Sequence, residues 1–303
     1  MKINITKFNN QLDKYKTSLN ELESLINKYY QELFQAKIYW KNAIANYFFD
    51  SLEQEKKQNK NFIIELNRLK EIYEYILTSY NKYGKKLEVN LENINKLINK
   101  IEDQNLEEIS LEYERLEINF DNDICEKIKN QQSKIKKAQD EETNYKNKLK
   151  SELKRIQEIE KNIKQKLIKI TIPKIQENDF QNHELGNNNE VYFDIEQLDI
   201  IEKKLIMYKE QIMLIFETIK ILFSEVKYNY ISENTQYIEK IDLDIDNRFK
   251  IITNNIENNI KLLNNNISSH RETELQINQE LEDIPQIKID FDINQFKGAF
   301  KNE

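Results

Sequence analysis

The sequence predicts an all-α protein made of long antiparallel helical hairpins and coiled coil. Only three Gly and two Pro occur among 303 residues, whereas average usage would supply about 36 of the two together. This deficit excludes folds that need many tight turns, such as β-sandwiches and barrels. Apolar residues recur at seven-residue spacing along much of the chain, the pattern of packed long helices. The 16 Tyr and 14 Phe supply side chains for burial and argue against disorder.

Residues 1–84 are predicted to form a first helical hairpin. Along its first helix two heptad positions are apolar: Leu12, Leu19, Ile26, Leu33, Trp40 and Tyr47, and, three residues later, Tyr15, Leu22, Tyr29, Ala36 and Ala43. A second run contains Phe62, Leu66, Leu69, Tyr73, Ile76 and Tyr80 and stops before Gly84, which predicts a helix C-cap. Two one-sided stripes can bury each other, so a hairpin is expected, with its turn near residues 41–42 or near residues 58–61.

Residues 85–172 are predicted to form a central coiled-coil rod. Ile128, Ile135, Leu149, Ile156, Ile163 and Ile170 share one heptad position, interrupted only by Glu142. The companion position is weakly apolar, so this stripe needs a second helix beside it. Residues 87–118 are predicted to be the antiparallel neighbour. Pro173 ends the rod, and residues 173–190, which contain Gly186, are predicted to be a linker.

Residues 191–270 are predicted to form a second helical hairpin. A shift of 183 residues places Trp40 on Phe223 and Tyr47 on Tyr230, and it also aligns apolar positions of the following helices. This alignment suggests an internal repeat of the first hairpin. Any two heptad patterns align at some shift, so an alignment without a common origin stays open.

Residues 271–303 are predicted to be an extended C-terminal tail. Ile287, Ile289, Phe291 and Ile293 alternate after Pro285, which is typical of a strand. Ile168, Ile170 and Ile172 alternate similarly, as do Ile3 and Ile5. These segments could pair into a short β-ribbon near the C-terminus, or the tail could be extended without pairing.

No residue pattern predicts an enzyme, a cofactor or a metal site. His183, His270 and Cys125 are far apart in sequence, and the run from Asp242 to Asp246 lacks the Gly and Glu of a calcium loop. A net charge of −7 is unfavourable for nucleic-acid binding. The absence of a long apolar stretch argues against stable membrane insertion, and the first residues lack a signal-peptide pattern.

The stretch from Trp40 to Phe48 resembles the turn of the WXG (Trp-Xaa-Gly) family of helical-hairpin proteins of bacterial type VII secretion, and the related LXG amino-terminal domains. In those families a first helix ends at Trp-Xaa-Gly, and an aromatic follows about eight residues after the Trp. Here Trp40-Lys41-Asn42 has Asn in place of Gly, and Asn tolerates a left-handed turn better than most residues. Phe48 occupies the aromatic position.

The resemblance implies a non-enzymatic secretion substrate or targeting partner, recognised through exposed helix faces by small helical hairpins or by secretion machinery. The partner-binding residues expected on this basis are Trp40, Asn42, Tyr47 and Phe48, with Phe223 and Tyr230 in the second hairpin. Such a protein would be cytoplasmic before export and secreted without a cleaved signal. The alternative from another class is a structural or tethering coiled-coil scaffold, in which the rod mediates self-association.

Overall fold

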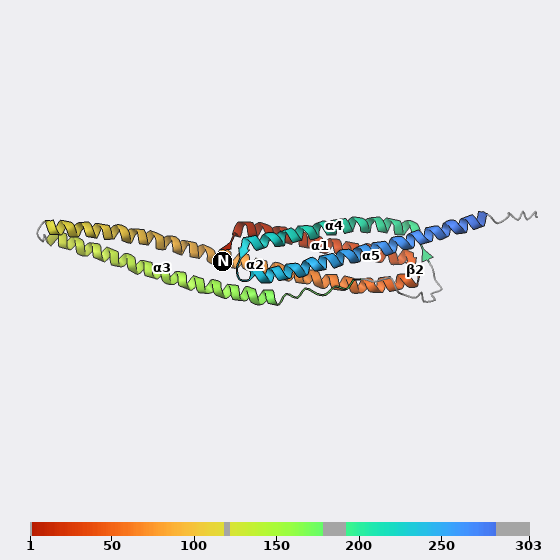
Figure 1. The fold of residues 1–303 in the computed structure, drawn as a ribbon, viewed down its shortest axis with the longest axis horizontal. Coiled ribbons are helices and arrows are strands. Elements are labelled where there is room, and N and C mark those ends of the chain that lie inside the picture. Colours follow the sequence, from red (N-terminus) through yellow and green to blue (C-terminus); the bar gives the residue numbers. More distant parts are fainter. Residues whose placement is uncertain (1, 118–121, 178–191, 283–303) are drawn as a thin grey trace, which may run out of the picture.

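The computed structural model describes residues 2–117, 122–177 and 192–282, and the predicted all-α fold is confirmed. The described helices are α1 (Ile5–Tyr39), α2 (Ala43–Glu117), α3 (Asn122–Ile168), α4 (Ile195–Asn229) and α5 (Thr235–Glu282). Four two-residue strands adjoin them: β1 (Lys2–Ile3), β2 (Trp40–Lys41), β3 (Tyr192–Phe193) and β4 (Tyr230–Ile231). Figure 1 shows an elongated molecule, with a helical bundle at one end and a two-helix rod projecting from it.

The bundle consists of α1, α4, α5 and the first half of α2. Helices α1 and α4 run antiparallel and pack closely, and an ion pair between Lys204 and Glu32 at 3.0 Å joins them. On the α2–α5 side, the rings of Phe62 and Phe249 meet edge to face with centroids 5.6 Å apart. The apolar heptad positions of all four helices point into one shared core. The stripes predicted from the sequence are therefore covered by other helices of the same chain.

The two halves of the bundle share one structural pattern at a shift of 190 residues. Ile5 corresponds to Ile195 and Tyr39 to Asn229, so α1 and α4 have the same length. Strand β1 pairs with β4 at one end of the bundle, and β2 pairs with β3 at the other, both antiparallel. The two halves therefore pack antiparallel and are joined by a strand pair at each end, as expected for an approximate twofold axis between them.

The N-terminal caps follow the same symmetry. Asn4 caps α1 and Asp194 caps α4, each side chain accepting a hydrogen bond at 3.1 Å from the backbone N–H three residues later. The backbone N–H of Asn4 donates to the carbonyl of Asn229, and that of Asp194 donates to the carbonyl of Tyr39, both at 2.9 Å. Each cap is therefore fastened to the C-terminal end of the helix from the other half.

The shift of 183 expected from the sequence is wrong by one heptad. At the structural shift of 190, Trp40 corresponds to Tyr230, and Phe223 corresponds to Leu33. A heptad pattern alone aligns equally well after a slip of seven residues, because the same helix face is presented again. The caps and strand pairs decide the register in the folded protein.

The rod consists of the C-terminal half of α2 packed against α3. The predicted helix end at Gly84 is wrong, because α2 continues to Glu117, and a Cβ at Gly84 would meet nothing within 4 Å. Ile94 and Leu97 are buried in the rod, and the Gln131 side chain on α3 donates to the Gln104 carbonyl at 3.1 Å. A continuous buried seam favours an uninterrupted helix over a cap. The predicted boundary between residues 84 and 85 therefore falls inside one helix.

The segment of residues 169–177, named the strap, lies across the α2–α5 side of the bundle. The backbone N–H of Thr171 donates to Glu65, and the Asn255 side chain donates to the Gln176 carbonyl at 2.9 Å. Glu65 and Asn255 are equivalent at the shift of 190, so the strap crosses near the approximate axis. Ile175 is buried there. The first residues of the predicted linker are thus packed, whereas residues 178–190 lie outside the described residues.

The predicted extended tail is wrong over residues 271–282, which belong to α5. Arg271 in this stretch forms an ion pair with Asp199 of α4. The predicted strand at residues 287–293 lies outside the described residues. Among those the structure describes, Ile3 pairs with Tyr230 rather than with residues 168–172.

Candidate functional site

The Trp40 pole is the end of the bundle where β2 pairs with β3. Trp40 packs against Phe48, Phe49 and Phe193 with ring centroids 5.4, 5.9 and 6.3 Å apart, and its exposed fraction is 1%. Phe48 is fully buried. Within the described residues the Trp40 indole Nε1 has no hydrogen-bond partner. These two predicted partner-binding side chains therefore lie in the core of the pole, out of reach of a partner.

Asn42 and Tyr47 reach the surface of the same pole. The Asn42 side chain caps α2 by accepting a hydrogen bond at 2.7 Å from the backbone N–H of Ala45. This role explains why Asn serves at a position where the resemblance expects Gly, because Asn is among the best N-cap residues. Tyr47 is 39% exposed. Of the four residues predicted at this turn, these two are accessible to another protein.

The Tyr230 pole is the opposite end, where β1 pairs with β4 and the rod joins the bundle. The Tyr230 hydroxyl donates to the Glu160 carboxylate of α3 at 2.9 Å, and the Asn234 amide donates to the same carboxylate at 2.6 Å. The Tyr80 hydroxyl also donates to Glu160. Burial, together with Glu160, raises the pKa of Tyr80. The sequence did not identify Glu160, which ties the rod to both halves.

Phe223, the sixth predicted residue, lies in the middle of the bundle. It contacts the rings of Tyr15 and Tyr73 at centroid distances of 5.4 and 6.3 Å, and it is 1% exposed. The structure thus divides the six predicted residues between two poles and the core, and it does not assemble them into one surface.

A buried polar cluster lies between α1, α2 and α5. Tyr30 donates to the Glu55 carboxylate at 2.6 Å, and Asn259 donates to Glu55 at 3.1 Å and to Tyr29 at 3.2 Å. The Asn59 amide donates to the Tyr30 hydroxyl at 2.6 Å. Burial and the nearby Glu55 raise the pKa values of Tyr29 and Tyr30. All five side chains are at most 1% exposed, so a substrate cannot reach them.

The symmetry-related location has no such cluster. The positions equivalent to Tyr29, Glu55, Asn59 and Asn259 carry, in that order, Ile219, Ile245, Phe249 and Leu69. The polar cluster therefore distinguishes the two halves of an otherwise symmetric core. Buried polar pairs are best attested as devices that fix register and partner choice, and this cluster would favour pairing of unlike halves.

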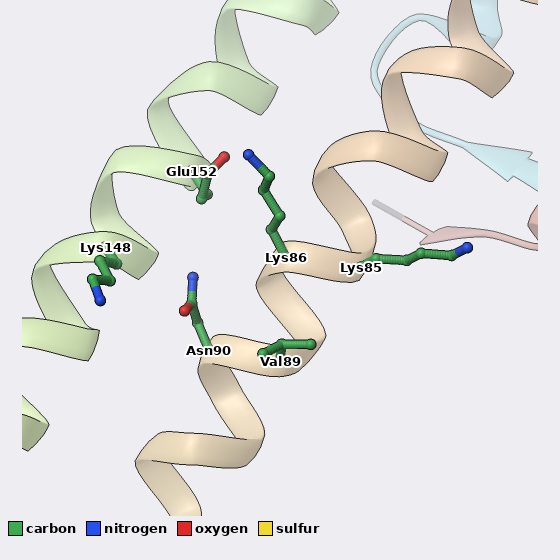
Figure 2. A pocket seen from close by; sticks show the side chains of 6 residues that line it. All are labelled: Lys85, Lys86, Val89, Asn90, Lys148 and Glu152. Carbon is green, nitrogen blue, oxygen red and sulfur yellow. The ribbon is translucent and has the colours of Figure 1, made fainter.

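Three surface depressions are lined by side chains of mixed charge. Figure 2 shows one between α2 and α3, where Lys86 and Asn90 point toward Glu152 across the gap, whereas Lys85 points away. Two further depressions adjoin each other over α1 and α2 and share Asn27 and Lys56. None of these three sets contains the nucleophile, base and orienting group of a catalytic site.

Metal-binding and membrane-spanning features are absent from the described ranges. No group of three His, Cys, Asp or Glu side chains there could hold a metal ion. The carboxylate of Asp246 instead bonds Lys250 at 2.7 Å and Lys220 at 2.9 Å, and these lysines lower its pKa. No helix in the same ranges has the length and apolar content needed to cross a bilayer.

A surface that the sequence reasoning missed runs along α4. Ile200, Met207, Leu214, Ile221 and Tyr228 recur every seven residues and are all exposed, Leu214 by 70% and Tyr228 by 81%. We name these five residues the α4 outer face. The equivalent positions of α1 are Asn10, Thr17, Ser24, Gln31 and Ile38. The seven-residue spacing was readable from the sequence, but only the packing shows that this stripe faces outward.

Comparisons with known proteins give no match: neither a protein-family model, nor a curated protein, nor a solved structure is significantly similar to this chain.

Proposed function

We propose that the chain is a non-enzymatic helical protein of a type VII secretion system, a substrate or targeting partner recognised through an exposed helix face. The resemblance of the turn at Trp40 to that of the WXG family supports the assignment to this secretion system. The head-to-tail bundle supports a binding role, because the chain consists of helical hairpins and its buried polar cluster is inaccessible to substrates.

The observation that carries this proposal is the α4 outer face. Apolar residues that recur along one exposed helix face are the kind of surface that a partner helix binds. Here an apolar residue appears on every second turn along almost the whole of α4, whereas α1 has polar residues at four of the five equivalent positions. Two halves whose helices have the same length and arrangement but whose outer faces differ indicate a requirement imposed from outside the fold.

The burial of Trp40 changes the role proposed for the turn. Trp40 and Phe48 fix the geometry of the pole, whereas Asn42 and Tyr47 are the residues that machinery could contact there. In this proposal the pole is a rigid end presented next to the first turns of α4.

The α2–α3 rod favours a second candidate function, that of a tether. Residues 85–117 of α2 would extend about 50 Å at 1.5 Å per residue, and Figure 1 shows the rod projecting away from the bundle. A scaffold that self-associates through the rod would use this projection and would not need the α4 outer face.

The test is export of a tagged chain from a host that carries the secretion system. The double variant Leu214→Gln with Ile221→Gln is expected to reduce export at least tenfold. Because both side chains are exposed, the melting temperature should change by less than about 2 °C.

The matched control is Ser24→Gln with Gln31→Ser, at the equivalent positions of α1, and it should be exported normally. Normal export of the α4 variant would contradict the proposed function.

The tether is tested by comparing the sedimentation of the full chain with that of a variant that lacks the rod. A tether that self-associates through the rod predicts an oligomer of the full chain that is lost in the variant.

A further inference from the structure

The charges beside the α4 outer face are predominantly acidic. The exposed ionisable residues along this side of α4 are Glu196, Lys203, Glu210, Glu217 and Glu225. Lys220 is shared between Glu217 at 2.8 Å and Asp246 at 2.9 Å, so it is already engaged within the chain. The exposed border thus has four carboxylates, of which Glu217 is paired with Lys220, and one lysine, Lys203. The other lysines of α4 are half-buried and paired with acidic residues of the same chain: Lys204, Lys209 and Lys227.

This charge pattern argues against a second copy of the chain as the occupant. An antiparallel pairing of two α4 helices centred on Leu214 would place Glu210 of one copy opposite residues 217–218 of the other. Glu210 would therefore lie close to Glu217 of the other copy, and like charges across a helix interface are unfavourable. The flanking charges of the same pairing are opposite, because Lys203 of one copy would face Glu225 of the other, so the repulsion is confined to the central Glu210–Glu217 contacts.

We propose that the α4 outer face binds one amphipathic helix of a partner protein, with apolar residues at seven-residue spacing and Lys or Arg beside them. This inference rests on the proposed function and names the chemistry of the partner. From Ile200 to Tyr228 the stripe covers 29 residues, a length of about 42 Å. The partner helix therefore has about eight turns, comparable with α1 and α4 themselves.

The same geometry predicts how the partner would be selected. The apolar stripe supplies affinity through burial, and the acidic border admits a basic helix and rejects an acidic one. Because these charges are exposed, salt screens them. Binding is therefore expected to weaken as the salt concentration rises, and the preference for a basic helix should decrease with it.

The experiment measures fluorescence anisotropy of two synthetic 28-residue helical peptides mixed with the full chain. Both peptides carry Leu at the positions of a heptad seam; one has Lys at the flanking positions and the other has Glu. The Lys peptide is expected to bind at least tenfold more tightly. The double variant Leu214→Gln with Ile221→Gln should weaken its binding at least tenfold, and Ser24→Gln with Gln31→Ser should leave it unchanged.

Charge reversal tests the border directly. Glu210→Lys with Glu217→Lys, shown by circular dichroism to keep its helical content, is expected to reverse the preference between the two peptides. Equal binding of both peptides, or Lys-peptide binding that survives the α4 substitutions, would overturn the inference. A concentration-dependent dimer that the α4 substitutions abolish would also overturn it, since the occupant would then be a second copy.

The two proposals fail in different ways. If export depends on the α4 outer face but the Lys peptide does not bind it, the basic helix is wrong and the proposed function stands. If the Lys peptide binds as expected but export is unaffected by the α4 substitutions, the interaction stands and the secretion function is wrong.

Discussion

Replacing both Trp40 and Phe48 with Ala is expected to unfold the Trp40 pole and to lower the melting temperature by more than about 10 °C. Each buried aromatic truncated to Ala costs about 3–5 kcal/mol, and whole domains are stable by only about 5–15 kcal/mol. The rings pack on each other and on Phe49 and Phe193, so their removal opens one shared cavity. Thermal and urea unfolding followed by circular dichroism measure the effect.

Tyr47→Ala is the matched control, because Tyr47 adjoins Phe48 in sequence but projects from the surface. Because Tyr47 is 39% exposed, its truncation is expected to reduce the unfolding free energy by less than about 2 kcal/mol, against about 6–10 kcal/mol for the double variant. A double variant of Trp40 and Phe48 that keeps its helical content and melting temperature would show that the two aromatics are not core residues. If such a folded variant also failed to bind its partner protein, Trp40 and Phe48 would be contact residues after all.

Raising the pH above 10 is expected to destabilise the bundle steeply. Burial raises the pKa values of Tyr15, Tyr29, Tyr30 and Tyr73 well above the ordinary value of 10. The folded chain keeps these protons while the unfolded chain loses them, so their contribution is complete below pH 10 and is lost as the pH rises. Each tyrosine reduces the unfolding free energy by about 1.4 kcal/mol per pH unit, and the four together reduce it by about 5.5 kcal/mol per pH unit.

Tyr73→Phe isolates one of these groups. Within the described residues the Tyr73 hydroxyl has no hydrogen-bond partner, so its removal should cost little stability at pH 7. Above pH 10 the unfolding free energy of the variant should fall less steeply with pH than that of the unmodified chain, by about 1.4 kcal/mol per pH unit. The measurement is urea unfolding at a series of pH values, with tyrosinate absorbance recorded in parallel. Ionisation of all tyrosines near pH 10 with the helices intact would contradict the burial of these four tyrosines.

The helices and the rod could be predicted from the sequence because a seven-residue apolar repeat determines which face of a helix is buried. The pairing of residues 87–118 with α3 follows from the narrow stripe of Ile128 and Ile135, which another helix had to cover. Gly84 was misread because a glycine is also tolerated inside a helix when packing continues on both sides. Strands β2, β3 and β4 were missed because two residues are too few to show an alternating pattern. Ile3 of β1 belonged to a predicted alternating segment, but its partner at Tyr230 was not predicted.

The functional residues were harder to predict than the fold. Trp40 was singled out as the only tryptophan, but rarity in the sequence does not distinguish a contact residue from a core residue. The heptad pattern also leaves a shift of seven undetermined, which made Phe223 rather than Tyr230 the apparent counterpart of Trp40. The α4 outer face could be recognised only once α1 and α5 were known to cover the other faces of α4.

Helices α1 and α4 of one chain cover each other, which leaves the α4 outer face as the exposed stripe. A zero-length carbodiimide tests this claim, because it joins an amine to a carboxylate in direct contact, and Lys204 lies 3.0 Å from Glu32. Isotope-labelled and unlabelled chains are unfolded together, refolded as a mixture, cross-linked and analysed by mass spectrometry. The account predicts a Lys204–Glu32 link within single chains. A link that joins labelled to unlabelled chains, or coupling of Lys204 to a carboxylate elsewhere, would contradict it.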